Sequence, residues 1–304
     1  MGITGDLMLG AAVLALSPIW APVLGARYCL DKLDCVLSKK PKKRAAALDK
    51  AFEQWQANRV SGFNWTSWKY YYDGKLCKAL PGFDADNYNF AFVGNVKSGK
   101  SALVNSVRGL PDTLVEDANN RICDNKGIAR MGRARVGFVE TTMDTSRYSF
   151  GNACENAVVW DVPGSGTQSH RAETYYKDKA LYAFDCLILV TSGAAAGEAD
   201  VALMKAASEM GQPFAIVRTK CDLDAQTLID ACMDPAEAVR MVREEVTMSL
   251  QKELAAAGLT RTPPIFLVNR KAFNGFQGMP SSLRFDEDKL LEWLAAVAKQ
   301  RHEA

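Results

Sequence analysis

The sequence predicts an α/β fold in which helices cover both faces of a mainly parallel, six-stranded sheet. Short apolar runs alternate with longer amphipathic stretches beyond residue 87, and 48% of the 304 residues are hydrophobic, which is ample for a packed core. Such alternation is typical of parallel sheets. The runs predicted to form strands are Phe90 to Val93, Val136 to Val139, Ala157 to Trp160, Cys186 to Thr191, Phe214 to Arg218 and Ile265 to Val268.

Helical periodicity appears between most of these runs and after the last one. The predicted helices are Ser101 to Arg108, Thr174 to Ala183, Ala199 to Met210, Pro235 to Ala257 and Glu287 to Arg301. The charges are nearly balanced, with 37 Lys and Arg against 35 Asp and Glu and a net charge of +2. This balance argues against nucleic acid as a partner.

Upstream of residue 87 the sequence changes character. Residues 7–26 carry no charge, and as a helix they would span about 30 Å, the thickness of the apolar part of a bilayer. Basic residues follow this segment and none precedes it, which places the rest of the chain on the cytoplasmic side of a membrane. We expect residues 1–30 to associate with an intracellular membrane, residues 31–86 to form a basic linker with a short helical region, and residues 87–304 to form the α/β domain. A hydrophobic helix buried within the protein is the alternative for residues 7–26.

The segment after the first predicted strand fits the pattern G-x-x-x-x-G-K-[ST]. It reads Gly94-Asn95-Val96-Lys97-Ser98-Gly99-Lys100-Ser101, and Ala102 continues into a predicted helix. Glycines let consecutive backbone N–H groups curl around phosphate oxygens, and the helix presents its positive N-terminal end. Lys100 would reach the β- and γ-phosphates, and Ser101 would hold Mg²⁺. We call residues 94–101 the phosphate loop and expect residues 94–102 to bind a nucleotide.

A second motif, Asp161-Val162-Pro163-Gly164, follows the third predicted strand. An Asp at the end of a buried strand can join the magnesium shell. The backbone N–H of the Gly can sense a γ-phosphate, so that the next segment is ordered only while this phosphate is present. We therefore expect Ser101 and Asp161 to be the metal ligands, and Lys100 and Gly164 to contribute to catalysis.

A third motif, Thr219-Lys220-Cys221-Asp222, ends the fifth predicted strand and selects the base. The carboxylate of Asp222 can accept two hydrogen bonds from guanine, whereas adenine offers no such pair of donors at that edge. The aliphatic part of Lys220 would lie along the purine face. Asn269, after the sixth predicted strand, belongs to a loop whose backbone would contact the base. The expected ligands are GTP or GDP with Mg²⁺.

Together these motifs resemble those of the immunity-related GTPases, a family of interferon-inducible, dynamin-like proteins. The resemblance covers roughly Asn87 to Arg301 and is carried by the phosphate loop, Arg133 to Met143, Val159 to Thr167 and Val217 to Asp222. It implies a Ras-like P-loop GTPase domain that binds GTP and GDP, dimerises through its nucleotide faces, hydrolyses GTP slowly and acts on internal membranes. Glu140 matches a family glutamate that is implicated in activation across the dimer.

Two positions depart from the expected pattern. Val136 stands where the family commonly has a Thr, and Ser165 stands where Ras-type enzymes carry a Gln that orients the attacking water. We therefore expect a membrane-associated GTPase that hydrolyses GTP slowly and self-assembles when GTP is bound. The alternative is a recruitment or scaffold protein that depends on guanine nucleotides and has little or no hydrolysis.

Overall fold

The computed structural model describes residues 37, 80–84, 87–108, 110, 134, 144–150, 156–164, 172–193, 197–259, 262–273 and 283–303. They contain a six-stranded sheet of order β2-β3-β1-β4-β5-β6. The β2–β3 pair is antiparallel and the other strand pairs are parallel. The strands are β1 Tyr88–Val93, β2 Ser146–Ser149, β3 Ala157–Asp161, β4 Cys186–Thr191, β5 Phe214–Arg218 and β6 Ile265–Leu267.

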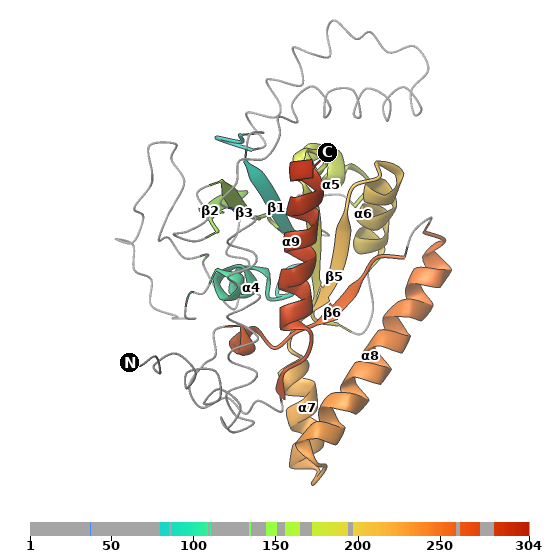
Figure 1. The fold of residues 1–304 in the computed structure, drawn as a ribbon. Coiled ribbons are helices and arrows are strands. Elements are labelled where there is room, and N and C mark those ends of the chain that lie inside the picture. Colours follow the sequence, from blue (N-terminus) through green and yellow to red (C-terminus); the bar gives the residue numbers. More distant parts are fainter. Residues whose placement is uncertain are drawn as a thin grey trace, which may run out of the picture.

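Helices cover both faces of this sheet (Figure 1). Helices α4 and α9 pack on one face, and α5 and α6 pack on the other. The long helix α8 packs against α7, and its Leu250 and Leu254 join the core on the α5 and α6 side of the sheet. Their bounds are α4 Lys100–Val107, α5 Ala172–Asp178, α6 Glu198–Glu209, α7 Cys221–Asp230, α8 Pro235–Ala257 and α9 Glu287–Glu303.

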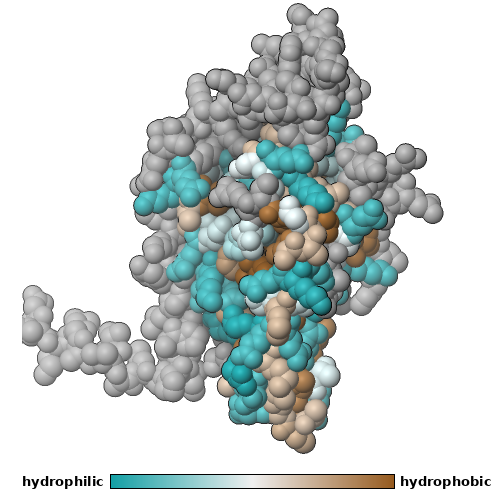
Figure 2. All heavy atoms as spheres, turned by 90° about the vertical axis from the view of Figure 1, so that its right-hand side faces the viewer, coloured by the Kyte–Doolittle hydropathy of each residue, from teal (hydrophilic) through white to brown (hydrophobic). Residues whose placement is uncertain are grey.

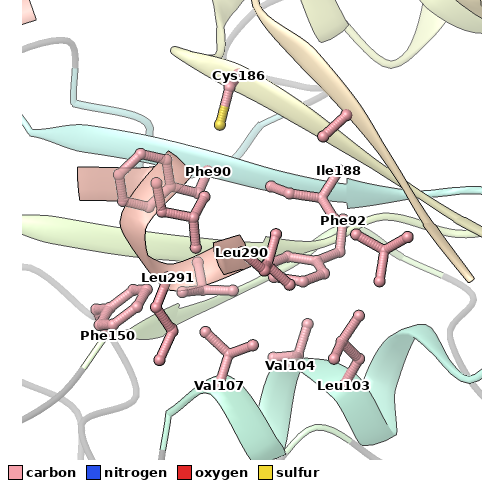
Figure 3. Packing of buried hydrophobic residues seen from close by; sticks show 14 of the residues in the cluster. Phe90, Phe92, Leu103, Val104, Val107, Phe150, Cys186, Ile188, Leu290 and Leu291 are labelled. Carbon is pink, nitrogen blue, oxygen red and sulfur yellow. The ribbon is translucent and has the colours of Figure 1, made fainter. Parts of the chain in front are cut away.

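The central strand β1 is buried on both faces, which explains its continuous apolar run. Successive side chains of a strand point to opposite faces. Phe90 and Phe92 accordingly pack against residues of α4 and α9 (Figure 3), whereas Ala91 and Val93 belong to the core on the α5 and α6 side. The strands are thus held in place from both sides, and their carboxyl ends are positioned by a packed core.

The predicted fold class is confirmed, and five of the six predicted strands are observed. The predicted strand Val136 to Val139 lies outside the described residues. The antiparallel strand β2 was not predicted, because its sequence Ser-Arg-Tyr-Ser has no apolar run and is only half buried at the sheet edge. Helix α7 was missed for a similar reason, since Cys221 and Ala225 are its fully buried residues.

One predicted helix is wrong in its extent. The segment Thr174 to Ala183 was expected to be continuous, but α5 ends at Asp178 and a 3-10 turn, Leu181–Ala183, follows. Ala180 between them has a φ of 49°, in the left-handed region, which an α-helix of L-residues cannot continue through.

The predicted N-terminal regions are mostly outside the described residues. Of residues 1–86, only residues 37 and 80–84 are described, so the apolar segment 7–26 stays a prediction. Within the part of the chain that is described, none of the helices combines the length and the apolar character needed to cross a bilayer.

Helix α8 begins and ends at the predicted residues, and its end residues explain why. The side chain of Asp234 accepts hydrogen bonds from the backbone N–H groups of Ala236 and Glu237, and Pro235 takes the first helical position. Gly258 ends the helix with a φ of 66°.

On the side of the molecule that Figure 2 presents, the described surface is mixed, with hydrophilic residues interspersed among apolar ones. Met248 of α8 is a large apolar side chain that is 64% exposed.

Asp286 joins α8, β6 and α9. Its backbone N–H donates to the carbonyl of Leu267 at 2.8 Å, and its carboxylate accepts from the Leu267 N–H at 3.2 Å, so both outward-facing backbone groups of that residue are bonded. The same carboxylate, almost fully buried, pairs with Arg243 of α8 and with Lys289 at 2.9 Å. Burial alone would raise the pKa of Asp286, but hydrogen bonds from Lys289 and Arg243 outweigh it, and the pKa is lowered.

Removal of this carboxylate should destabilise the fold strongly. We expect Asp286→Ala to lower the free energy of unfolding by about 3 kcal/mol, because it leaves the partly buried Arg243 and the buried backbone N–H of Leu267 without this acceptor. Asp288→Ala is the control, since the ion pair of Asp288 in α9 with Arg284, which precedes the helix, is partly exposed and should contribute less than about 1 kcal/mol. Urea titrations measure both values, and equal losses in the two variants would contradict the assignment.

The loss of unfolding free energy in Asp286→Ala should also depend on pH. Because the folded-state pKa lies below the ordinary value of 3.8, the carboxylate stabilises the fold fully above that value. The stabilisation is lost as the pH falls from there through the lowered pKa, so the difference between wild type and variant should shrink in this acidic range.

Candidate functional site

The phosphate loop connects β1 to α4 and has the backbone of a tight turn. Gly94 has a φ of 128° and Gly99 a φ of 90°. A Cβ at Gly94 would lie 2.2 Å from the carbonyl oxygen of Val190, so this position accepts only glycine. The first turn of α4 has no side-chain cap among the described residues, and its N–H groups lie where the motif places a phosphate.

Lys100 is almost fully buried under this loop. Its ammonium group donates to the carbonyl of Gly94 at 3.1 Å and to that of Asn95 at 2.9 Å. The loop therefore curls around its own lysine, as a phosphate-binding loop requires.

The two predicted metal ligands lie side by side. The hydroxyl of Ser101 donates to a carboxylate oxygen of Asp161 at 2.6 Å, and Asp161 sits at the carboxyl end of β3 with 1% of its surface exposed. Oxygen donors are what Mg²⁺ prefers, and nucleotide-bound Mg²⁺ is typically held by one or two protein oxygens together with phosphates and water. The Ser101 and Asp161 side chains therefore fit a magnesium ion.

Gly164 packs directly against the phosphate loop. A Cβ at this position would lie 2.6 Å from a methyl group of Val96 and 2.9 Å from its backbone nitrogen. The segment that precedes it is anchored, because the buried hydroxyl of Tyr175 donates to the carbonyl of Pro163 at 2.6 Å. Burial, followed by the charges of Asp161 and Asp200, raises the pKa of Tyr175, so this hydroxyl keeps its proton.

The base motif also contacts the phosphate loop. The hydroxyl of Thr219 donates to the carbonyl of Ser98 at 2.6 Å, and the ammonium group of Lys220 donates to the carbonyl of Lys97 at 3.1 Å. Asp222 lies in the first turn of α7. Burial raises its pKa, and its own N–H and the charge of Lys271 partly offset this. The structure thus brings the second and third motifs together around the first.

Asn269 is placed in the expected loop, but its side chain is fully buried. Its amide oxygen accepts from the backbone N–H of Lys271 at 3.1 Å, and its amide nitrogen donates to the carbonyl of Leu283 at 3.2 Å. These bonds fix the conformation of the loop. Because the Asn269 side chain is buried, the predicted contact with a base would be made by the backbone of the loop.

Sequence reasoning missed two buried carboxylates that hold these loops. Asp200, at the start of α6, accepts from the side-chain amide of Asn95 at 3.0 Å and from the N–H of Gly197 at 3.2 Å. Glu287, at the start of α9, accepts from the backbone N–H of Asn269 at 2.7 Å. The sequence signal was the same for both, an acidic residue in the first turn of a predicted helix, which is equally common on solvated helices.

Three residues named from the sequence, Val136, Glu140 and Ser165, lie outside the described residues. Their roles stay predictions.

A model of a protein family described as "Interferon-inducible GTPase (IIGP)" matches residues 75–280, which is more than half of the chain. The chain belongs to the interferon-inducible GTPase family. The resemblance that the motifs suggested is thereby confirmed, and the described α/β domain is the GTPase domain of this family.

Individual relatives agree with this assignment. The chain is 29% identical to the mouse protein "Interferon-inducible GTPase 1" over 196 residues, which cover 64% of this chain and 43% of that protein. It is 32% identical to the rat "Interferon-inducible GTPase 5" over 203 residues, covering 66% and 39%. The matched region is thus less than half the length of these relatives.

Among solved structures, a probable GTP-binding protein EngB is similar with a TM-score of 0.35 and 14% identity, covering 70% of this chain and 99% of that one.

Burial of Glu287 makes the stability of the site depend on pH. Burial raises its pKa from 4.5 to about 7, although N–H groups of Asn269 and Phe285 partly stabilise the charged form. The folded state therefore binds this proton more tightly than the unfolded state, and the stabilisation is lost as the pH rises through about 7.

We expect Glu287→Gln, which cannot ionise, to become more stable relative to wild type between about pH 5 and pH 8. Urea unfolding at both pH values measures this difference, with Glu292→Gln, on the same helix, as the control. A difference that does not change with pH would contradict the role of Glu287.

Proposed function

We propose that this chain binds guanine nucleotides and hydrolyses GTP to GDP and phosphate. The observation that carries the proposal is the direct contact of three motifs from different strand ends: Gly164 packs on Val96, and Thr219 and Lys220 bond to the phosphate loop. Ligands of open α/β sheets bind at the carboxyl ends of the strands, and these motifs meet there.

Selection of guanine is assigned to Asp222. Asp222 lies in the first turn of α7, directly after Thr219 and Lys220, which bond to the phosphate loop, and this proximity supports the assignment. A relative from mouse is named "T-cell-specific guanine nucleotide triphosphate-binding protein 2", and it is 28% identical over 195 residues. This name supports a guanine nucleotide as the ligand of the present chain.

Each residue of the site has a proposed part in hydrolysis. The backbone N–H groups of the phosphate loop and the ammonium group of Lys100 hold the phosphates, and Ser101 and Asp161 hold Mg²⁺. When bound, the ion would neutralise charge on the phosphate oxygens. The N–H of Gly164 detects the γ-phosphate. Glu140 is proposed to act across a dimer of two copies.

Membrane association and self-assembly complete the proposal. We assign residues 7–26 to an intracellular membrane, with the GTPase domain on the cytoplasmic side, and expect copies with bound GTP to associate. The uncharged segment and the basic residues that follow it support the membrane assignment. If the full chain were released from membranes by alkaline carbonate, insertion of this segment would be ruled out.

Base selection is tested with Asp222→Asn. The amide replaces one acceptor by a donor, so guanine loses a hydrogen bond and xanthine, which carries an oxygen at that edge, gains one. We expect the affinity for GDP to fall by about 100-fold and that for xanthosine diphosphate to rise, as measured by competition with a fluorescent nucleotide. Asp230→Asn, at the exposed end of the same helix, is the control. Equal affinity of the wild type for ATP and GTP would overturn the guanine assignment.

Hydrolysis is tested with Lys100→Ala, measured as release of phosphate from GTP over a range of protein concentrations. We expect wild-type turnover per molecule to rise with concentration, because assembly completes the site, and turnover of the variant to be lost. Lys205→Ala, an exposed lysine of α6, is the control. Tight binding of GTP without turnover at any concentration would instead favour the scaffold alternative, for which Val136 and Ser165 are the supporting residues.

A further inference from the structure

Lys97 of the phosphate loop has a backbone conformation that its side chain disfavours. Its φ is 64°, in the left-handed region, while the other positive φ angles of the loop belong to Gly94 and Gly99. The motif leaves this position open to any residue, and glycine would adopt this conformation without strain. A strained residue persists only where the surrounding structure enforces its conformation, and such residues cluster at functional sites.

The surroundings of Lys97 do enforce its conformation. Its carbonyl accepts from the ammonium group of Lys220 at 3.1 Å, and the carbonyl of Ser98 accepts from the Thr219 hydroxyl at 2.6 Å. The N–H of Ser98 donates to the carbonyl of Asn95 at 3.3 Å. These three bonds fix the main chain on both sides of the residue, so the direction in which the Lys97 side chain leaves the loop is fixed as well.

The charge of Lys97 is also placed differently from that of the other lysines of the site. Lys100 is buried and donates to two carbonyls within the loop, and Lys220 donates to the Lys97 carbonyl. The Lys97 side chain is exposed, and no described carboxylate forms an ion pair with it. Lys97 therefore carries an exposed cation on the loop to which the motif assigns phosphate binding.

This position matters because phosphoryl transfer is catalysed almost entirely by positioning and by stabilisation of charge on the phosphate oxygens. Ser165 lacks the length and the amide of the glutamine that Ras-type enzymes use at that point. A cation supplied by the phosphate loop itself would contribute the stabilisation that such a site needs.

We propose that Lys97 is a catalytic residue whose ammonium group contacts phosphate oxygens of the GTP held by its own loop. The inference rests on the proposed GTP hydrolysis. In that reaction the water oxygen bonds to the γ-phosphorus, and the bond from this phosphorus to the bridging oxygen breaks with its electron pair passing to GDP. The protons of the water pass to the phosphate and to solvent. The ammonium group of Lys97 stabilises the charge that develops on the oxygens.

Replacement by glycine separates catalysis from stability. Lys97→Gly removes both the cation and the backbone strain, so we expect Tm at or above the wild-type value together with a kcat lower by about tenfold to 100-fold. A purely structural lysine would instead lower Tm and leave kcat per folded molecule unchanged. The matched control is Cys232→Gly, because Cys232 is exposed beyond α7 with a φ of 69°, and it should relieve strain without any change in kcat.

A second pair of variants keeps the backbone strain and changes only the charge. We expect Lys97→Met to lose the same factor in kcat as Lys97→Gly, and Lys97→Arg to retain most of the activity. Binding supplies a readout besides turnover. Because the contact strengthens as charge develops, Lys97→Met should weaken binding of GDP with aluminium fluoride and Mg²⁺ by about tenfold or more, and binding of GDP alone much less.

The source of the cation is tested by mixing Lys97→Gly with excess Asp222→Asn loaded with xanthosine triphosphate, which keeps Lys97 and the phosphate-binding residues, and by measuring the GDP formed from GTP. Activity that stays low supports action within one copy, whereas restored activity would show that Lys97 acts on a neighbouring copy and would overturn the proposal. A wild-type kcat in both Lys97→Gly and Lys97→Met would also overturn it and leave the proposed GTPase intact. Absence of turnover in the wild type at every protein concentration would overturn both.

Discussion

The hydrogen bond from the Thr219 hydroxyl to the Ser98 carbonyl is the contact on which the site depends most. It joins the end of β5 to the loop after β1, two strands that do not pair with each other because β4 lies between them. The Thr219 N–H also donates to the carbonyl of Thr191 at the end of β4, at 2.8 Å. The spacing between the phosphate loop and Asp222 is therefore set by the width of the sheet, and a nucleotide must match that spacing.

Buried carboxylates hold the loops around this contact, and their surroundings decide their charge. Asp286 faces two cations, Arg243 and Lys289, and its pKa is lowered in spite of burial. Glu287, the next residue, is held mainly by backbone N–H groups, and burial raises its pKa to about 7. Amide dipoles thus offset only part of the cost of burying a charge, whereas paired cations offset all of it. Two neighbouring acids with opposite shifts anchor the start of α9, one against the β6 edge and the other against the base loop.

Most of the fold could be predicted from the sequence, because β1, β3, β4 and β5 are buried on both faces and their apolar runs are continuous. The motif residues could also be named, since each motif follows such a run. The tertiary partners of individual side chains could not be predicted. The first-turn acids Asp200 and Glu287 give the same local signal as solvated residues, and only the fold shows that they bond to Asn95 and to the Asn269 backbone. The break at Ala180 was hidden for a related reason, because alanine favours a helix and tertiary contacts override that preference here.

The hydrogen bonds between Asp286 and β6 affect how copies of the chain can associate. An edge strand normally offers unpaired backbone groups to which a strand of another molecule can add. At β6 the N–H and carbonyl of Leu267 are already taken by Asp286, and the strand is three residues long. This edge of the sheet is therefore protected against strand addition, and disordered aggregation through it would first have to break the bonds of a buried carboxylate.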